Sequence, residues 1–357
     1  MKPILAITYH LFAFLTVLPC FAQSSPVTEY PLKWPGDASG STHELTYNHE
    51  GGEVVWVTGQ NHDHLARVAA DGKTDFFPMP VGSRPHGILF DGQGVLWVSL
   101  EFAGLVVSID QETGSIMEQI DVRIRAEGAK APINPCPHGL GLGPDGKTLW
   151  FTGKKTNTVG KINPDRSIEH FELPTVGAVL IYLSAGPDGN MWGTELVGNK
   201  IMRVTPEGRI DEFEIPTKGS RPIAIVRGPD GRSMWFSEEA GNKVGRIDMD
   251  GSISEYPIPL TQRNVILAGM AFDDLGNLWT HSYVNGKEPS PAGADHIIKI
   301  DKSVLLAQAG DLTNIPVTFY QVPTRNTVMH RIMQGPDGAI WFTELGADKL
   351  GKLKLGR

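Results

Sequence analysis

A repeat of about 42 residues constrains the fold of this chain more than any other feature of its sequence. Seven of the eight tryptophans follow an apolar residue and precede a short β-prone run. Their spacings are 41, 53, 42, 43, 44 and 62 residues, and the two long values indicate insertions. These tryptophans are Trp56, Trp97, Trp150, Trp192, Trp235, Trp279 and Trp341. Repeats of this period are typical of solenoids and propellers, so we expect an array of similar units.

The fullest unit, residues 220–259, has the pattern of four short strands joined by turns. Its strand-like segments are residues 222–226, 234–237, 244–248 and 253–258. The turn at 228–231 has the sequence Gly-Pro-Asp-Gly, in which Pro presets φ and Gly accepts a positive φ. Helical repeats of similar length would show a period of about 3.6 residues, which these alternating segments lack. Four antiparallel strands per unit predict a β-propeller blade.

The composition agrees with one large all-β domain. With 40% hydrophobic and 20% charged residues, the chain of 357 residues can bury a sizeable core, which excludes a mainly disordered protein. Its 41 glycines and 26 prolines favour turns and short strands over helices. The Gly-Pro-Asp-Gly turn recurs at 143–146, 186–189, 228–231 and 335–338. We predict a single domain over residues 23–357.

The two ends of the chain predict how the ring closes. After Trp341 a third strand follows at residues 348–353, and the chain then ends without a fourth. Residues 27–32 have the fourth-strand pattern, but no blade precedes them. We therefore expect the N-terminal strand to complete the last blade, which removes an open sheet edge. The predicted fold is an all-β, seven-bladed β-propeller of four-stranded antiparallel blades.

Residues 1–22 have the features of a secretory signal peptide. Lys2 precedes an apolar run over residues 3–18, and Ala22 suits the position before a signal-peptidase cut. A buried helix, a membrane anchor or a lipoprotein modified at Cys20 are the alternatives. With the signal removed, we expect a secreted or periplasmic protein without membrane association. Cys136 is then the one remaining cysteine, which excludes an intrachain disulfide.

Charge indicates which partners to expect. The formal net charge is −8, and Lys and Arg residues do not cluster as a phosphate-binding surface requires. Nucleic acid is therefore not an expected partner. We expect a monomer that acts on a small-molecule substrate.

Four histidines occupy the same position in different units. The start of the first strand of each blade lies nearest the propeller axis, and in units one, two, three and seven this position is a histidine. The four residues are His43, His86, His138 and His330. These units are neighbours in a closed ring, so we expect the histidines to form an arc at the channel mouth. Singly, each would be more typical of a packed or solvated side chain.

The ends of the second strands lie on the same face as these histidines. This position offers Glu101, Glu195, Glu238, Tyr283 and Glu344. We expect Glu101 to lie beside His86 and Glu344 beside His330, and a carboxylate with an imidazole suits acid–base chemistry or a divalent metal. The glutamates of the Trp-x-x-Glu pattern could also be residues of the repeat without a functional role. Glu101 lies one residue further from its tryptophan than this pattern requires.

Two insertions and one short motif complete the candidate features. Residues 124–135 and 285–295 are expected on the histidine face, where they suggest a lid over the channel mouth or merely decorative loops. The segment His62-Asp63-His64 has ligand-like spacing, and its alternative is an ordinary loop.

Taken together, the repeat elements resemble those of the virginiamycin B lyase (streptogramin B lyase) family. The shared elements are Pro-His-Gly-Ile, Gly-Pro-Asp-Gly, Trp-Phe-Thr-Glu, Asn-Lys-Val-Gly-Arg-Ile and Glu-Tyr-x-Ile-Pro, and the resemblance covers residues 27–354. It implies a seven-bladed propeller that opens a cyclic depsipeptide at its ester by elimination, with a magnesium ion. The family site implies a Glu-Pro-His-Gly segment, a glutamate at the end of the next strand and a further histidine.

Two places in the chain match that site in part. Residues 84–87, Arg-Pro-His-Gly, combine with Glu101, and the resemblance makes Glu101 the candidate magnesium ligand, although Arg84 stands where the family has its first glutamate. Chain order instead selects His330 with Glu344, where Val328 occupies the glutamate position.

These features favour a secreted, lyase-like enzyme acting on a cyclic ester or related small natural product. His86 is the expected base and Glu101 its partner or a metal ligand, while His138 and His330 complete the catalytic set. The substrate is expected to contact His43, Arg84, Tyr283 and Glu344. The alternatives are a lactone hydrolase or cyclase on the same fold, and a non-catalytic binding or scaffold propeller.

Overall fold

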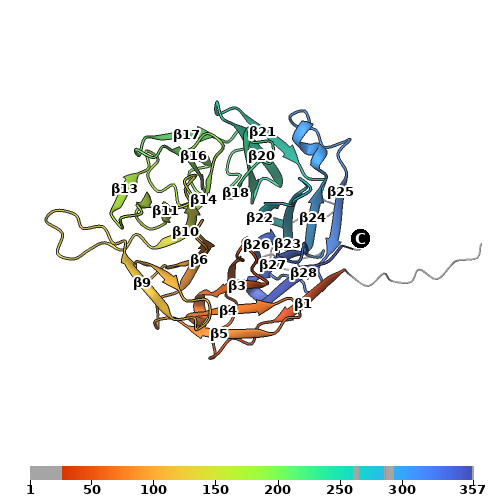
Figure 1. Cartoon of the computed structure of the whole chain (residues 1–357). Helices are drawn as coiled ribbons and strands as arrows, with labels where there is room; N and C mark the ends of the chain where they lie inside the picture. Colours follow the sequence, from red (N-terminus) through yellow and green to blue (C-terminus); the bar gives the residue numbers. More distant parts are fainter. Residues whose placement is uncertain (1–25, 260–264, 285, 287–292, 356–357) are drawn as a thin grey trace, which may run out of the picture.

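The computed structural model describes residues 26–259, 265–284, 286 and 293–355. In this part of the chain the backbone forms seven four-stranded antiparallel sheets around a common axis (Figure 1). The prediction of an all-β, seven-bladed propeller is therefore confirmed. The expected signal peptide, residues 1–22, lies outside the described residues, as do residues 285 and 287–292 of the second insertion.

The first four blades follow one another along the chain. Blade 1 consists of β2 (Thr42–Thr46), β3 (Val54–Gly59), β4 (His64–Ala69) and β5 (Thr74–Pro78). Blade 2 consists of β6 (Pro85–Phe90), β7 (Leu96–Leu100), β8 (Leu105–Ile109) and β9 (Ile116–Asp121). Blade 3 consists of β10 (Pro137–Leu142), β11 (Leu149–Gly153), β12 (Thr158–Ile162) and β13 (Ile168–Glu172). Blade 4 consists of β14 (Leu180–Ala185), β15 (Met191–Glu195), β16 (Lys200–Val204) and β17 (Ile210–Glu214).

The remaining blades include the one that joins the two ends of the chain. Blade 5 consists of β18 (Pro222–Arg227), β19 (Ser233–Glu238), β20 (Lys243–Asp248) and β21 (Ile253–Pro257). Blade 6 consists of β22 (Val265–Phe272), β23 (Leu278–Val284), β24 (His296–Ile300) and β25 (Val317–Gln321). Blade 7 consists of β26 (Met329–Gln334), β27 (Ile340–Glu344), β28 (Lys349–Leu353) and β1 (Val27–Pro31). In the described segments, three short 3-10 helices lie between strands, η1 (Gln60–His62), η2 (Lys302–Leu306) and η3 (Leu345–Ala347).

The first strand of each blade lies at the centre of the ring. Figure 1 shows β6, β10, β14, β18, β22 and β26 around the middle, with the fourth strands toward the outside. Each inner strand contacts the inner strands of both neighbouring blades, β2 meeting β6 and β26. Residues at the start of these strands therefore come together from different blades, as the site prediction requires.

The tryptophan repeat is explained by packing between the blades and by the turns. All seven repeat tryptophans are at most 2% exposed and fill the layers between neighbouring sheets. The indole of Trp192 donates to Asp188 at 3.0 Å, and that of Trp341 donates to Asp337 at 2.9 Å. Both acceptors belong to Gly-Pro-Asp-Gly turns, so in blades 4 and 7 the turn and the tryptophan are hydrogen-bonded to each other.

Glycine on the third strand permits close packing within a blade. In blade 5, Gly245 on β20 lies under the Phe236 ring of β19, and a Cβ placed on it would come within 2.0 Å of that ring. Gly245→Ala should therefore destabilise the fold by about 1–3 kcal/mol, the usual range for overpacking a core. Urea unfolding of the single variant measures the loss.

A second substitution distinguishes this clash from a general effect of the added methyl group. Phe236→Leu in the Gly245→Ala chain removes the ring that the methyl group meets, so part of the loss should return in a double-mutant cycle. If the double variant lost as much stability as the two single variants together, the packing argument would be contradicted.

The N-terminal segment forms the outer strand of blade 7. Strand β1 pairs antiparallel with β28, with Val27 opposite Leu353 and Pro31 opposite Lys349. Glu29 accepts hydrogen bonds from the Lys349 ammonium at 2.5 Å and from the backbone and hydroxyl of Thr324, both at 2.8 Å. The blade thus combines segments from both ends of the chain.

The first insertion does not cover the ring. The loop between β9 and β10 carries an isolated bridge between Ile124 and Ile133, and in Figure 1 it extends outward, away from the centre. The lid suggested for this loop is therefore wrong. Among the described residues, no helix has the length and apolar character needed to cross a membrane.

Candidate functional site

Four imidazole rings form a continuous arc near the axis. The ring centroids lie 3.5 Å apart between His138 and His86, 4.2 Å between His86 and His43, and 3.9 Å between His43 and His330. Each histidine is the second residue of an inner strand, β10, β6, β2 and β26. The pairing with the next strand shifts register at this point in all four blades. Such irregularities re-aim side chains, here within one arc.

Burial sets the charge state of the arc. His86 has no exposed surface, and His43 and His138 are also buried, whereas His330 is partly exposed. Burial, together with the neighbouring His330, lowers the pKa of His43 to about 3. Burial likewise lowers the pKa of His86 and of His138. These three imidazoles are therefore neutral at neutral pH and present lone pairs rather than charges.

A buried carboxylate that the sequence analysis missed, Glu44, lies at the His330 end of the arc. Its Oε1 is 2.9 Å from His330 Nδ1 and accepts a hydrogen bond from the Tyr182 hydroxyl, and its Oε2 is 3.5 Å from Arg331 Nε. Burial alone would raise the pKa of Glu44, but the Arg331 charge, the hydrogen bond from His330 and the nearby His43 imidazole hold it well below its usual range. Glu44 is therefore an anion.

Glu101 provides a second carboxylate at the opposite end of the arc. Its Oε1 is 3.4 Å from His138 Nδ1 and 3.8 Å from the Lys154 ammonium, and its Oε2 accepts a 2.6 Å hydrogen bond from Gln60. Burial would raise the pKa of Glu101, but the hydrogen bond from His138 and the charge of Lys154 lower it. Glu101 thus orients one imidazole of the arc and stays ionised beside it.

The structure pairs carboxylates and imidazoles differently from the sequence prediction. Glu101 contacts His138 rather than His86, and His330 contacts Glu44 rather than Glu344. The prediction rested on the position of the residues along their strands, which places the imidazole and the carboxylate of each pair at the same end of one hairpin. The imidazoles instead reach across to the neighbouring blade, so both predicted pairings are wrong.

Two other predicted substrate contacts, Arg84 and Tyr283, lie beside residues outside the imidazole arc. The guanidinium of Arg84 donates to Asn61 Oδ1 at 2.5 Å and lies over the Phe102 ring, 4.8 Å from its centroid. Tyr283 is buried, and burial with the charges of Glu239 and Asp295 raises the pKa of its hydroxyl.

The motif His62-Asp63-His64 connects blades rather than forming a ligand set. Asp63 Oδ1 accepts the backbone N–H of Arg84 at 2.8 Å, and His62 Nε2 is 3.3 Å from Asp348 in blade 7. His64 Nδ1 contacts the carbonyl oxygen of His62.

The Trp-x-x-Glu glutamates form a repeated structural motif. Glu195, Glu238 and Glu344 end the second strands of blades 4, 5 and 7 without exposed surface. Within the described residues, their carboxyl oxygens have no hydrogen-bond partner. Burial raises the pKa of each to about 8, helped by the nearby charges of Glu212, Glu255 and Glu29. The repetitive role is therefore the better interpretation of these three residues.

The protonated state of Glu238 predicts how stability varies with pH. In the unfolded chain this carboxyl ionises near 4.5, whereas in the fold it keeps its proton up to about 8. The folded state then binds more protons between these values, so the contribution of Glu238 to stability falls as pH rises through this window.

Glu238→Gln should remove this loss. Because one pKa unit corresponds to about 1.4 kcal/mol, we expect the variant to gain at least about 2 kcal/mol over the parent above pH 8 and little at pH 4. Urea unfolding across pH measures the difference, with Glu172→Gln on the exposed end of β13 as control. A pH-independent difference would contradict the assignment.

Magnesium does not fit the residues around Glu101. Magnesium prefers several oxygen ligands, usually including carboxylates and water. The Glu101 carboxylate is instead engaged by an ammonium, an imidazole and an amide nitrogen, and Arg84 replaces the second carboxylate that the resemblance implies. We therefore assign no chemistry to magnesium here.

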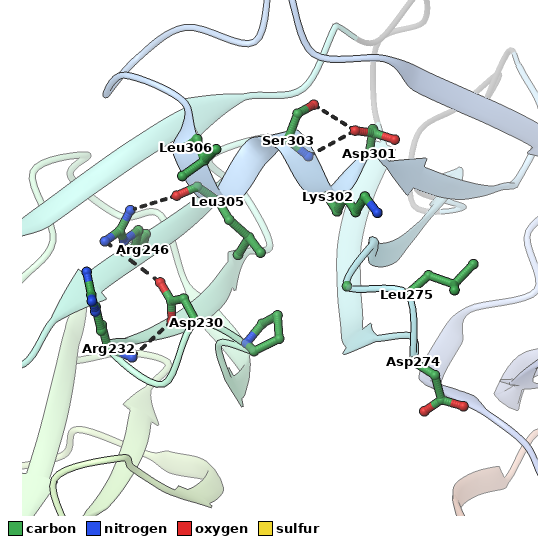
Figure 2. Close-up of a pocket in the computed structure, with 12 residues that line it drawn as sticks. Asp230, Arg232, Arg246, Asp274, Leu275, Asp301, Lys302, Ser303, Leu305 and Leu306 are labelled. Atoms are coloured by element: carbon green, nitrogen blue, oxygen red, sulfur yellow. Dashed lines mark hydrogen bonds and ion pairs between the residues drawn. The ribbon is translucent and has the colours of Figure 1, made fainter.

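A separate cavity of about 860 Å³ lies between blades 5 and 6 (Figure 2). Its walls come from the turns after β18 and β22 and from η2, which places it on the face opposite the start of the inner strands. Its polar groups largely contact one another: Arg246 lies 3.9 Å from Asp230 and donates to the Leu305 carbonyl, and Ser303 donates to Asp301. The cavity is thus remote from the histidine arc.

Comparisons with known proteins agree with the repeat and the fold. The model of the virginiamycin B lyase family matches residues 110–287. The virginiamycin B lyase of Nocardia farcinica is 30% identical over 138 residues, which cover 39% of this chain and 43% of that protein. The chain thus matches less than half the length of this curated relative.

Solved structures match over most of the chain. A streptogramin B lyase structure has a TM-score of 0.75 at 26% identity and covers 92% of this chain and 97% of its own. The virginiamycin B lyase of Staphylococcus aureus has a TM-score of 0.74 at 27% identity, with 92% and 99% covered. A catalytically inactive form of that enzyme, solved with quinupristin, has a TM-score of 0.73 at 26% identity, also with 92% and 99% covered.

Proposed function

We propose that this chain, a virginiamycin B lyase-like seven-bladed β-propeller, is a secreted or periplasmic enzyme that opens a cyclic ester or related small natural product by elimination. The observation that carries the proposal is the pair His138 and Glu101, 3.4 Å apart at one end of the imidazole arc, with the Lys154 ammonium beside them. A neutral imidazole oriented by a carboxylate is a general base, and the adjacent cation favours developing negative charge.

Proton transfer is assigned to His138 rather than to His86. His86 is enclosed between the rings of His43 and His138, so a substrate reaches it only after those rings move. His138 lies at the end of the arc and has a carboxylate partner.

The reaction proposed for this pair is an elimination across a carbon–carbon bond. The imidazole of His138 takes a proton from the carbon next to the one that carries the ester oxygen. The carbon–oxygen bond breaks, its electron pair leaves with the carboxylate, and a carbon–carbon double bond forms without consuming water. Glu101 stabilises the resulting imidazolium, and Lys154 stabilises the charge of the departing carboxylate.

The surface around the arc favours a largely apolar substrate. Loops on the face where the inner strands begin carry exposed apolar side chains, namely Val81, Phe102, Val176 and Val197. An amphiphilic macrocycle could place apolar side chains on this rim and its ester at the axis, because buried apolar area supplies most of the affinity of such sites.

The product formed from quinupristin and a panel of other cyclic depsipeptides and macrolactones tests the proposal. Elimination gives a linear product of unchanged mass, whereas hydrolysis adds the mass of one water. We expect at least one panel member to be linearised without a mass change. If none is consumed, or every product carries added water, the proposal is wrong.

A non-catalytic binding propeller is the second candidate. It is favoured by the limited exposure of the arc, since three of the four histidines are buried and His330 is only partly exposed. Such a protein would bind members of the panel without changing them.

A further inference from the structure

We propose that His43, Glu44, His86 and His330 bind a divalent first-row transition-metal ion on the propeller axis. One ligand atom from each of these residues lies within 4.8 Å of the others. The four side chains come from three neighbouring inner strands, β2, β6 and β26, so the site requires the assembled ring.

The hydrogen bond of His86 leaves one of its nitrogens available as a ligand. His86 Nδ1 is 3.0 Å from the backbone carbonyl oxygen of His138, and only a protonated nitrogen can donate to a carbonyl. The proton of the neutral ring is therefore on Nδ1, which leaves the lone pair on Nε2. That Nε2 is fully buried and has no hydrogen-bond partner in the part of the chain that the structure describes. Metal-binding histidines are oriented in this way by the opposite ring nitrogen.

Glu44 supplies the negative charge that a dication needs. Its Oε1 faces His330 at 2.9 Å, whereas Arg331 contacts the other oxygen, Oε2, at 3.5 Å. The guanidinium balances part of the carboxylate charge and orients it without standing between Oε1 and the imidazoles. The contacts of the Glu44 carboxylate with His330 and Arg331 hold its Oε1, the metal-binding atom, in place before an ion binds.

The donor set selects the class of metal. Three imidazoles and one carboxylate form a nitrogen-rich site, which suits zinc, iron, cobalt, nickel or copper, whereas magnesium prefers oxygen ligands. Ligands bound at about 2.1 Å in a tetrahedral site lie roughly 3.4 Å apart. The ligand atoms, which lie within 4.8 Å of one another, would therefore move closer together when an ion binds.

This inference concerns binding and stands whether or not the chain is a lyase. If it is, the ion would lie beside the proposed base, because His86 stacks on His138 with centroids 3.5 Å apart. An ion there could polarise a substrate carbonyl. If the chain bound no metal, the proposed elimination by His138 would not be contradicted. If the chain did not convert any cyclic ester, the proposed metal site would not be contradicted.

Metal titration of the mature chain after chelator treatment tests the site. We expect one Co²⁺ or Zn²⁺ per chain by calorimetry, an absorption band for the Co²⁺ complex, and affinity at least about 100-fold higher than for Mg²⁺. A chain that binds neither ion, or binds Mg²⁺ equally well, would overturn the proposal.

Two variants identify the ligands. His86→Asn keeps an N–H that can donate to the His138 carbonyl but lacks Nε2, and it should weaken Co²⁺ binding more than about 10-fold. Glu44→Gln should weaken it similarly. His138→Asn is the matched control, a buried member of the arc outside the donor set, and it should retain most of the affinity. Unchanged binding in both ligand variants, with native circular dichroism, would exclude this site.

Discussion

Replacing Glu101 by Gln is expected to lower kcat/KM for linearisation of a cyclic ester by about 100-fold to 10,000-fold, the usual range for acid–base catalysis, because the base His138 depends on this carboxylate. The substitution keeps the size of the side chain but removes the charge that orients His138 across 3.4 Å and stabilises its imidazolium form. His138→Asn should produce a similar loss. Steady-state kinetics on a substrate identified from the panel, with the folded state checked by circular dichroism, measures both effects.

Two comparisons make this result specific. Glu195→Gln changes a buried glutamate of the repeated motif in blade 4, away from the arc, and should leave turnover unchanged. The double variant of Glu101 and His138 should be no slower than the slower single variant, because residues that act as a unit are not additive. Full activity of Glu101→Gln would show that the pair does not perform the chemistry.

Removing β1 is expected to cost on the order of 5 kcal/mol or more of stability. A chain starting at Lys33 loses the buried side chains of Val27 and Leu32, each contributing roughly 1.5–3 kcal/mol. It also loses the Glu29 network with Lys349 and Thr324, and it exposes the edge of β28. Thermal unfolding and size-exclusion chromatography should show a lower Tm and association of chains.

A chain starting at Gln23 is the matched control, because it removes only the predicted signal peptide and keeps β1. It should unfold in one cooperative transition and remain a monomer. If the chain starting at Lys33 matched it in Tm and in size, the N-terminal strand would not be needed to complete blade 7.

Local patterns made most of the fold predictable. The tryptophan repeat, the Gly-Pro-Asp-Gly turns and the strand-like segments of residues 220–259 recur once per blade, so the packing within a blade and against its neighbour also recurs at the repeat period. The central position of the four histidines followed from the same order, because the first strand of a blade lies innermost.

The partners within the site could not be predicted in this way. Along a regular strand, neighbouring residues point to opposite faces, which places His43 and Glu44 apart. A register shift between Thr42 and Leu45 breaks this alternation, and both side chains belong to the same cluster. The sequence nonetheless contained an indication of this contact. An acidic residue follows His43, a basic residue follows His330, and these two histidines belong to neighbouring blades.

The pairing of Glu101 depended on contacts between blades. Sequence order suggested His86, which belongs to the same hairpin, whereas the side chain lies against His138 and Lys154 of blade 3. The repeat predicts the packing that recurs between neighbouring blades, but it contains no information on polar contacts particular to one pair of blades, such as that of Glu101 with His138.

Isotope labelling tests the central claim, elimination at His138 and Glu101, most directly. The full mature chain would convert quinupristin, or the panel member that it linearises, in water enriched in the heavy oxygen isotope, with the product analysed by mass spectrometry. We predict a linear product of unchanged mass without label, formed by the parent chain and strongly reduced with Glu101→Gln. Incorporation of labelled oxygen, or equal product formation by Glu101→Gln, would contradict it.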